Sequence, residues 1–382
     1  MKAYKLEIQN KDYLTGINDF LRKLFSEKII DSLLVQQETV SGKSVIHVLT
    51  KAEEEVMGTN PLAPLLLVNS ATLVSRLTVD NTQNKIGAVM RSCEIRALVE
   101  LVKLKQASLD NLIIIGVDCT GTYESEVYQR IAEKYKNSKE ITDTYLALNN
   151  KTEAELMEGE ILRQACLGCE YPNPSGADIS ISFIGCDATK EIIIQFSEKF
   201  GEVSPEKLGL VPADSTDHWT EASKVALERR TKYKDDLFKE TLKEMKDAKS
   251  FLQQLEHCRR CGNCRDECPI CYCRECVFDS LTFEHDSEQY FEWAQKKGKI
   301  RMPTDTLLFH MTRMNHMAIS CVACGQCTSA CPNRIPIANF FKTMGSKVQE
   351  LFGYKPGRSV DEENPQSTFK EDEFPEIGES GL

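Results

Sequence analysis

The sequence predicts an α/β domain followed by a helical linker and a ferredoxin domain that holds two iron–sulfur clusters. Two observations carry this prediction. Short apolar strands alternate with amphipathic helical stretches over residues 1–205, and two cysteine runs of identical spacing lie in the second half of the chain. The length of 382 residues leaves room for two or three domains at roughly 150 residues each.

One strand–helix–strand unit stands out in the first domain. Residues 86–90 form a short apolar run, residues 95–102 carry apolar side chains at helical spacing, and residues 112–117 form a second apolar run. A strand, a helix and a strand at this length predict parallel pairing. Two further apolar runs, 178–185 and 191–196, are separated by a short turn and favour a hairpin.

Composition divides the chain into four segments. We expect an α/β domain at 1–205, a charged helical linker at 206–254, a dicluster ferredoxin domain at 255–345 and an acidic tail at 346–382. The ferredoxin domain contains an insertion, 277–320, which could dock a partner or cover the clusters. The tail is acidic and interrupted by prolines, so in isolation it should be disordered.

Charge and hydropathy exclude two broad classes of function. Lys and Arg number 47 against 58 Asp and Glu, and this net charge of −11 argues against sequence-independent nucleic-acid binding. No apolar run approaches the ~20 residues of a membrane span, and the N-terminus lacks the apolar stretch of a signal peptide. We therefore expect a cytoplasmic, reducing location, in which the 16 cysteines more often hold metal than form disulfides.

The two cysteine runs give the strongest signal. Each reads Cys-x2-Cys-x2-Cys-x3-Cys-Pro, the spacing of bacterial ferredoxins, in which the fourth cysteine of each run ligates the other cluster. The predicted ligand sets of two [4Fe–4S] clusters are Cys258, Cys261, Cys264 and Cys331 for one, and Cys321, Cys324, Cys327 and Cys268 for the other. Two zinc sites are the alternative, but zinc does not require this signature twice.

Seven further cysteines leave alternatives open. Four of them could meet at the carboxyl ends of neighbouring strands and hold a third cluster, or could be buried core thiols: Cys93, Cys119, Cys166 and Cys169. Three others, Cys271, Cys273 and Cys276, are one short of a four-ligand site. They could complete a site with a ligand from another chain or with His257, His310 or His316, or they could simply be packed thiols.

Three short motifs carry a family resemblance. They are Arg91-Ser92-Cys93-Glu94-Ile95-Arg96-Ala97-Leu98, Gly116-Val117-Asp118-Cys119, and Cys166-x2-Cys169 followed by Ala177-Asp178 and Gly185. In this order they resemble the beta subunits of coenzyme F420-reducing hydrogenases and dehydrogenases. The second half resembles one branch of that family, the beta subunits of F420-dependent formate dehydrogenases and their bacterial relatives.

The resemblance implies that the α/β domain is a flavoprotein domain with FAD, a [4Fe–4S] cluster held by the four N-terminal cysteines, and electron exchange with F420. Arg91 and Arg96, with Ser92, are then candidates for contacts to the cofactor phosphates, because a helix N-terminus favours anions. Salt bridges of the two arginines with Glu94 or Glu100 are the alternative. The chain has no GxGxxG fingerprint, so the flavin expectation depends on the family alone.

Two classes of function follow. The first is a flavin-containing oxidoreductase subunit that passes electrons between a soluble two-electron carrier, F420 or a similar molecule, and a catalytic partner subunit through [4Fe–4S] clusters. The second is an iron–sulfur relay and docking subunit without flavin. In either case the partner would be a formate dehydrogenase, a hydrogenase or a complex that resembles heterodisulfide reductase, and the sequence does not choose among them.

Overall fold

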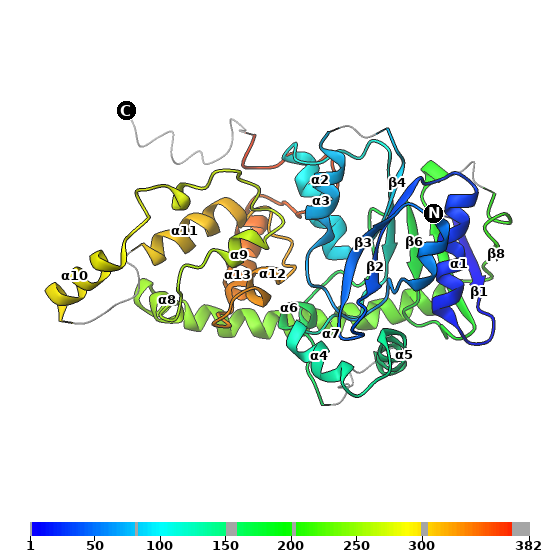
Figure 1. The fold of residues 1–382 in the computed structure, drawn as a ribbon, viewed down its shortest axis with the longest axis horizontal. Coiled ribbons are helices and arrows are strands. Elements are labelled where there is room, and N and C mark those ends of the chain that lie inside the picture. The colour runs from blue at the N-terminus through cyan, green and yellow to red at the C-terminus, as the bar shows by residue number, and fades with distance from the viewer. Residues whose placement is uncertain (1, 81–82, 150–158, 201–203, 299–304, 369–382) are drawn as a thin grey trace.

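The computed structural model describes residues 2–80, 83–149, 159–200, 204–298 and 305–368 (Figure 1). An α/β domain lies at one end of the molecule and a small helical domain that carries the two cysteine runs lies at the other (Figure 1). Among the described residues, no helix is both long and apolar enough to cross a membrane.

A mixed sheet of 8 strands forms the α/β domain, in the order β3-β2-β4-β5-β6-β7-β1-β8. Strands β2, β4, β5 and β6 pair in parallel, and the remaining pairs are antiparallel. This topology confirms the mixed α/β prediction, the parallel strand–helix–strand unit and the β6–β7 hairpin. The strands are β1 (Lys2–Glu7), β2 (Ser32–Glu38), β3 (Val45–Thr50), β4 (Ile86–Arg91), β5 (Leu112–Val117), β6 (Ile179–Ser182), β7 (Glu191–Phe196) and β8 (Val211–Pro212).

Helices cover both faces of the sheet because its central strands are apolar on both sides. Helix α1 (Tyr13–Ser26) packs on one face against the β5 and β6 side chains. Helices α2 (Ser70–Thr78) and α3 (Ser92–Lys103) pack on the other face. This second core continues into the helical domain through Phe251, Phe309 and Phe340, so the two domains share one apolar cluster.

The linker is more than a solvated spacer. Strand β8 pairs with β1, and helices α7 (Asp217–Glu244) and α8 (Ala248–Gln254) follow. Helix α7 runs along both domains (Figure 1). Its buried Arg230 donates to the backbone carbonyls of Cys119, at 2.9 Å, and Cys169, at 3.4 Å. The linker therefore supports the loops that carry two of the N-terminal cysteines.

The other helical segments are short, apart from α5 in the first domain, two helices in the insertion and the long helix that ends the second domain. They are η1 (Glu53–Gly58), α4 (Ser125–Ala132), α5 (Ser138–Asn149), α6 (Gln164–Leu167), η2 (Glu198–Phe200), α9 (Asn263–Asp266), η3 (Val277–Asp279), α10 (Ser287–Lys297), α11 (Thr306–Met317), α12 (Gln326–Ser329) and α13 (Ile337–Leu351). Helix α13 continues to Leu351 and so crosses the expected boundary between residues 345 and 346. Its buried residues extend as far as Gly345.

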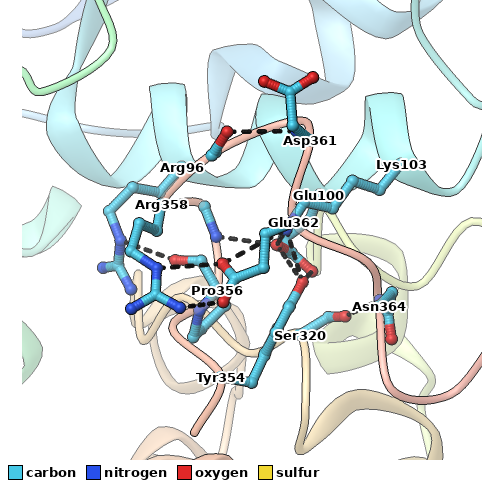
Figure 2. A network of polar contacts seen from close by, with 12 residues as sticks. Arg96, Glu100, Lys103, Ser320, Tyr354, Pro356, Arg358, Asp361, Glu362 and Asn364 are labelled. Atoms are coloured by element: carbon cyan, nitrogen blue, oxygen red, sulfur yellow. Dashed lines mark hydrogen bonds and ion pairs between the residues drawn. The ribbon is translucent and has the colours of Figure 1, made fainter. Parts of the chain in front are cut away.

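The chain after α13 lies against the α/β domain instead of projecting into solvent. In this strap, residues 352–368, the Tyr354 hydroxyl lies 2.6 and 2.7 Å from the two carboxylate oxygens of Glu100 (Figure 2). The Gly357 amide donates to Glu100 at 2.8 Å, and Arg96 donates to the Pro356 carbonyl at 3.1 Å. The strap is thus held by contacts to α3 residues that lie more than 250 positions earlier in the chain. The rest of the tail, 369–382, lies outside the described residues.

The hydroxyl of Tyr354 should stabilise the contact between the two domains. A hydrogen bond to a charged group contributes about 1.5–3 kcal/mol, so Tyr354→Phe should lower the Tm of the cluster-loaded protein by a corresponding amount. Tyr272→Phe is the matched control, since Tyr272 is 41% exposed. Equal melting temperatures for the two variants would contradict a structural role of the strap.

Candidate iron–sulfur centres

The two cysteine runs fold alike. After the second cysteine of each run comes a glycine in the left-handed region, Gly262 with φ 81° and Gly325 with φ 79°, and a short helix, α9 or α12, follows directly. The residue before that second cysteine also has positive φ in both runs, 52° at Arg260 and 61° at Ala323. A side chain at Gly325 would meet the Cβ of Ala165 at 2.5 Å. This glycine therefore allows the second run to approach the α/β domain closely.

In the ferredoxin domain, each group of neighbouring thiols includes members of both cysteine runs, and their ligation of clusters stays a prediction. Burial raises the pKa of Cys264 to about 11, and the nearby thiolates of Cys258, Cys331 and Cys261 raise it further while Arg313 opposes them. We call these four cysteines the outer set. Cys261 is its exposed member.

The second group takes its fourth member from the first run. Burial raises the pKa of Cys327 well above its usual range, and Cys268, Cys324 and Cys321 add to this effect while Arg313 opposes it. We call these four cysteines the middle set. Among the described residues, no three His, Cys, Asp or Glu side chains are placed to hold a single metal ion. A cavity of about 30 Å³ is lined by all four cysteines of the middle set.

The N-terminal cysteines also converge. Cys93 and Cys119 follow the neighbouring parallel strands β4 and β5, and Cys166 and Cys169 lie on and just after α6. Burial raises the pKa of Cys119 to about 11; Arg91 and Arg230 oppose the shift, and the thiolates of Cys166 and Cys169 add to it. We call these four cysteines the N-terminal set.

The N-terminal set lies beside the middle set. Cys324 is among the thiolates that raise the pKa of Cys93, after burial and Glu94. The Arg163 guanidinium, which precedes α6, donates to the Cys324 carbonyl at 3.1 Å and so ties the two sets together. The three sets therefore lie in the order N-terminal, middle, outer.

The predicted phosphate-binding residues have partners within the protein. Arg91 is buried and donates to Gln36 at 2.9 Å and to the Ala63 carbonyl at 2.6 Å. Arg96 is also buried; besides Pro356 it donates to the Val322 carbonyl at 3.1 Å, and its guanidinium lies 3.5 Å from the Tyr171 ring centroid. Ser92 is buried, and its hydroxyl has no hydrogen-bond partner in the described structure. Contact of these residues with a cofactor stays a prediction.

A carboxylate of the protein itself occupies the start of α3. Glu94 accepts from the Arg91 amide at 2.7 Å and from the Ser70 amide, in the first turn of α2, at 2.9 Å. The buried ion pair that forms is Arg91–Glu94, at 3.9 Å. For Arg91, the structure therefore agrees better with a salt bridge to Glu94 than with a free side chain for a phosphate. This salt bridge is buried.

A cavity of about 380 Å³ is lined by residues from the start of α1, from α5 and from the segment between β6 and β7. Its mainly apolar lining includes Tyr13, Phe183, Asp143 and Thr120, and Thr120 directly follows Cys119. The buried Tyr13 side chain lies beside the Asp143 carboxylate, and burial together with that carboxylate raises the pKa of Tyr13. Cavities of roughly 300–1,000 Å³ with apolar walls and a few polar groups are typical of small-molecule sites. The cavity therefore has the size and lining of a small-molecule site.

The three surplus cysteines, Cys271, Cys273 and Cys276, form no metal site of their own within the described residues. Cys273 is exposed, whereas Cys271 is half-buried near Cys268 and Arg313. Of the three candidate histidines, His310 alone has a hydrogen-bond contact to cysteine sulfur in the described structure, and that sulfur is Cys258 of the outer set, at 3.2 Å. Burial and Arg313 lower the pKa of His310 to about 4, so its imidazole is neutral. Metal binding at the surplus cysteines stays a prediction.

Family comparisons agree with this division. Residues 253–335, which contain the outer and middle sets, match the model of the 4Fe-4S dicluster domain. Residues 83–208, which contain the N-terminal set, match the model of the C-terminal part of the coenzyme F420 hydrogenase/dehydrogenase beta subunit. The chain is a relative of these F420-linked beta subunits. The resemblance expected from the sequence and the dicluster ferredoxin domain are thereby confirmed.

Two curated relatives match nearly end to end. The F420-dependent formate dehydrogenase subunit beta of Methanocaldococcus jannaschii is 26% identical over 367 residues, covering 90% of this chain and 91% of the relative. The F420-dependent formate dehydrogenase 1 subunit beta of Methanococcus maripaludis is 27% identical over 380 residues, covering 92% of each. A chain of the F420-reducing [NiFe] hydrogenase complex from Methanosarcina barkeri is 12% identical with a TM-score of 0.43, over 63% of this chain and 92% of that one.

The crossed grouping predicts which clusters respond to which cysteine. Cys331→Ala should give the same electron paramagnetic resonance spectrum of the reduced protein as Cys261→Ala, because both remove a ligand of the outer cluster. Cys327→Ala should perturb a different signal. A Cys331→Ala spectrum that instead matches Cys327→Ala would contradict the crossed arrangement.

Proposed function

We propose that this chain is the electron-transfer beta subunit of an F420-dependent formate dehydrogenase. It would pass electrons between F420 at a bound FAD and a catalytic partner subunit, through three [4Fe–4S] clusters. The observation that carries the proposal is the unbroken order of the three cysteine sets across two domains. The names of the two long relatives favour F420 as the carrier and formate dehydrogenase as the partner.

The cavity beside Cys119 supports a two-electron site at the N-terminal end. Tyr13, Asp143 and Thr120 would hold the polar edge of the flavin ring, with Phe183 against its face. When bound, FAD would accept a hydride from reduced F420 and release the two electrons singly to iron–sulfur clusters, with loss of a proton. The hydroxyl of Tyr145 on α5 donates to the Gly121 carbonyl and accepts from the Thr120 hydroxyl, and so holds the segment that follows Cys119.

The protein would hold the clusters in place by binding their loops from outside. Arg230 fixes the carbonyls of Cys119 and Cys169, and Arg163 fixes that of Cys324. Burial raises the pKa of Cys119 and Cys264 to about 11 each. Cluster binding must therefore displace protons from these thiols, and the binding free energy also stabilises the fold.

The outer set would be the exit to the partner. It lies furthest from the sheet, and its Cys261 is exposed, whereas the cysteines of the middle set are only partly exposed. Helix α11 of the insertion covers the sets, with Arg313 donating to the Cys264 sulfur at 3.1 Å. Helix α10 lies at the end of the molecule beyond them (Figure 1).

One observation favours the second candidate, a relay and docking subunit without flavin. Glu94 occupies the helix N-terminus that a cofactor phosphate would otherwise use. Cofactor content separates the candidates. The proposed subunit should contain about twelve iron and twelve sulfide per chain, together with one flavin released on denaturation. Iron near eight without flavin would remove the N-terminal cluster and favour the docking role.

Reduction of the clusters by F420 tests the proposed order of the three cysteine sets. Cys169→Ser should abolish reduction of the middle and outer clusters by reduced F420, since it removes a ligand of the cluster next to the cavity. Dithionite should still reduce both clusters, because their own ligands are intact. Cys186→Ser is the matched control, since Cys186 lies outside all three sets and should leave F420-driven reduction unchanged. Normal F420-driven reduction in Cys169→Ser would exclude the proposed route.

A further inference from the structure

We propose that two buried arginines, one in each interval between neighbouring cysteine sets, raise the reduction potentials of the clusters on either side. Arg163 lies between the N-terminal and middle sets, and Arg313 lies between the middle and outer sets. Their charge would allow adjacent clusters to hold electrons at the same time. The inference depends on the clusters of the proposed function but not on the identity of the carrier or the partner.

Arg313 is hydrogen-bonded to Cys264 of the outer set and lies near thiols of the middle set and near Cys271. It comes from α11, is 3% exposed, and donates to the Cys264 sulfur at 3.1 Å and to the Cys264 carbonyl at 2.9 Å. Thiolates of both ferredoxin sets surround it: Cys264 of the outer set and Cys268 and Cys327 of the middle set raise its pKa against the effect of burial.

No ion pair among the described residues joins Arg313 to a carboxylate. The rings of Phe309 and Phe341 lie 5.6 and 5.2 Å from its guanidinium carbon and exclude water from its other sides. An unpaired buried charge is strongly unfavourable. The anionic clusters are therefore the counter-charge that this arginine requires.

Arg163 has the equivalent position one interval earlier. It is 3% exposed and binds the middle-set loop through the Cys324 carbonyl at 3.1 Å and the Ser329 hydroxyl at 3.0 Å. The thiolates that face it come from both sides, Cys166 and Cys93 from the N-terminal set and Cys324 from the middle set. Its one carboxylate neighbour among the described residues, Glu124, lies 3.6 Å away with a side chain that is 38% exposed, so it neutralises Arg163 only in part.

A cluster with four thiolate ligands is negatively charged and becomes more so when it accepts an electron. That electron repels a second electron on the next cluster, and the repulsion is strong because the site has a low dielectric constant. A fixed cation between two clusters offsets it. Net charge and hydrogen bonds to the sulfurs are the known determinants of cluster potential, and Arg313 supplies both. A chain that receives electrons in pairs needs such compensation.

The experiment is a potentiometric titration of the loaded protein with redox mediators, followed by electron paramagnetic resonance. Arg313→Gln should lower the reduced-to-oxidised ratio of the outer cluster about tenfold at a fixed potential, a shift of about 59 mV for one electron. The middle cluster should shift in the same direction by less, because Arg96 and Lys342 also face Cys321. The N-terminal cluster should keep its potential.

Two variants make the result specific. Arg163→Gln should shift the N-terminal and middle clusters and spare the outer cluster. Arg334→Gln removes the same charge three residues after Cys331, from a side chain that is 79% exposed, and should shift none of them. Unchanged potentials in an iron-loaded Arg313→Gln, or equal shifts in Arg334→Gln, would overturn the proposal.

Arg313→Lys covers the case in which Arg313→Gln fails to assemble clusters. It keeps the charge but cannot reach the Cys264 sulfur and carbonyl together, so it should shift only the outer cluster, and by less than tenfold. In that case Arg163→Gln is the neutral test, and an iron-loaded Arg163→Gln with wild-type potentials throughout would overturn the proposal. Mediators replace the carrier in every titration, so a failure of F420 to reduce the chain would leave these outcomes readable.

Discussion

The contact between the N-terminal and middle cysteine sets is the constraint on which the rest of the structure depends. Electron transfer between the domains requires the Cys324 loop to lie beside Cys93, although the two residues belong to different domains. Several independent interactions hold this contact closed. The strap binds α3 through Glu100, α7 spans both domains, and the apolar cluster of α3 continues into α13.

This arrangement has an energetic consequence. The domain contact buries thiols and guanidinium groups together, and each is unfavourable when it is desolvated alone. Burial raises the pKa of Cys324 to about 12, so the free thiol is neutral at pH 7 and offers little to Arg163. With iron bound, the same position carries negative charge beside the arginine. Assembly of the clusters should therefore strengthen the domain contact, and folding and cofactor loading are coupled.

The sequence was sufficient for features that depend on local order. The cysteine spacing and the alternation of strand and helix are both short-range patterns. They predicted the dicluster domain, the parallel β4–β5 pair and the hairpin, and these are confirmed. Convergence of Cys93 with Cys119 also followed from local reasoning, because adjacent parallel strands end at the same edge of a sheet.

Features that depend on distant contacts could not be read in the same way. The acidic composition of the tail predicts disorder, but Glu100, 254 residues from Tyr354 in the chain, orders its first part. The buried positions of Arg313 and Arg163 could not be predicted, because nothing in their local sequence distinguishes them from surface arginines. Arg96 was assigned to the helix N-terminus for its charge, whereas its observed partners are carbonyls of Val322 and Pro356. A charged residue in an apolar helix stretch, as at Arg96, is the available clue to such a buried contact.

At the turn between β4 and α3, Glu94 takes a place that a phosphate has in dinucleotide-binding folds. In dinucleotide-binding folds, glycines at the first strand–helix turn leave room for a phosphate at the helix N-terminus. Here a carboxylate satisfies the amides of Arg91 and Ser70, and Arg91 and Arg230 face Cys119. The cationic charge at the strand ends is thus directed toward the cysteine set. The contacts of Glu94 therefore leave the start of α3 a poor phosphate site.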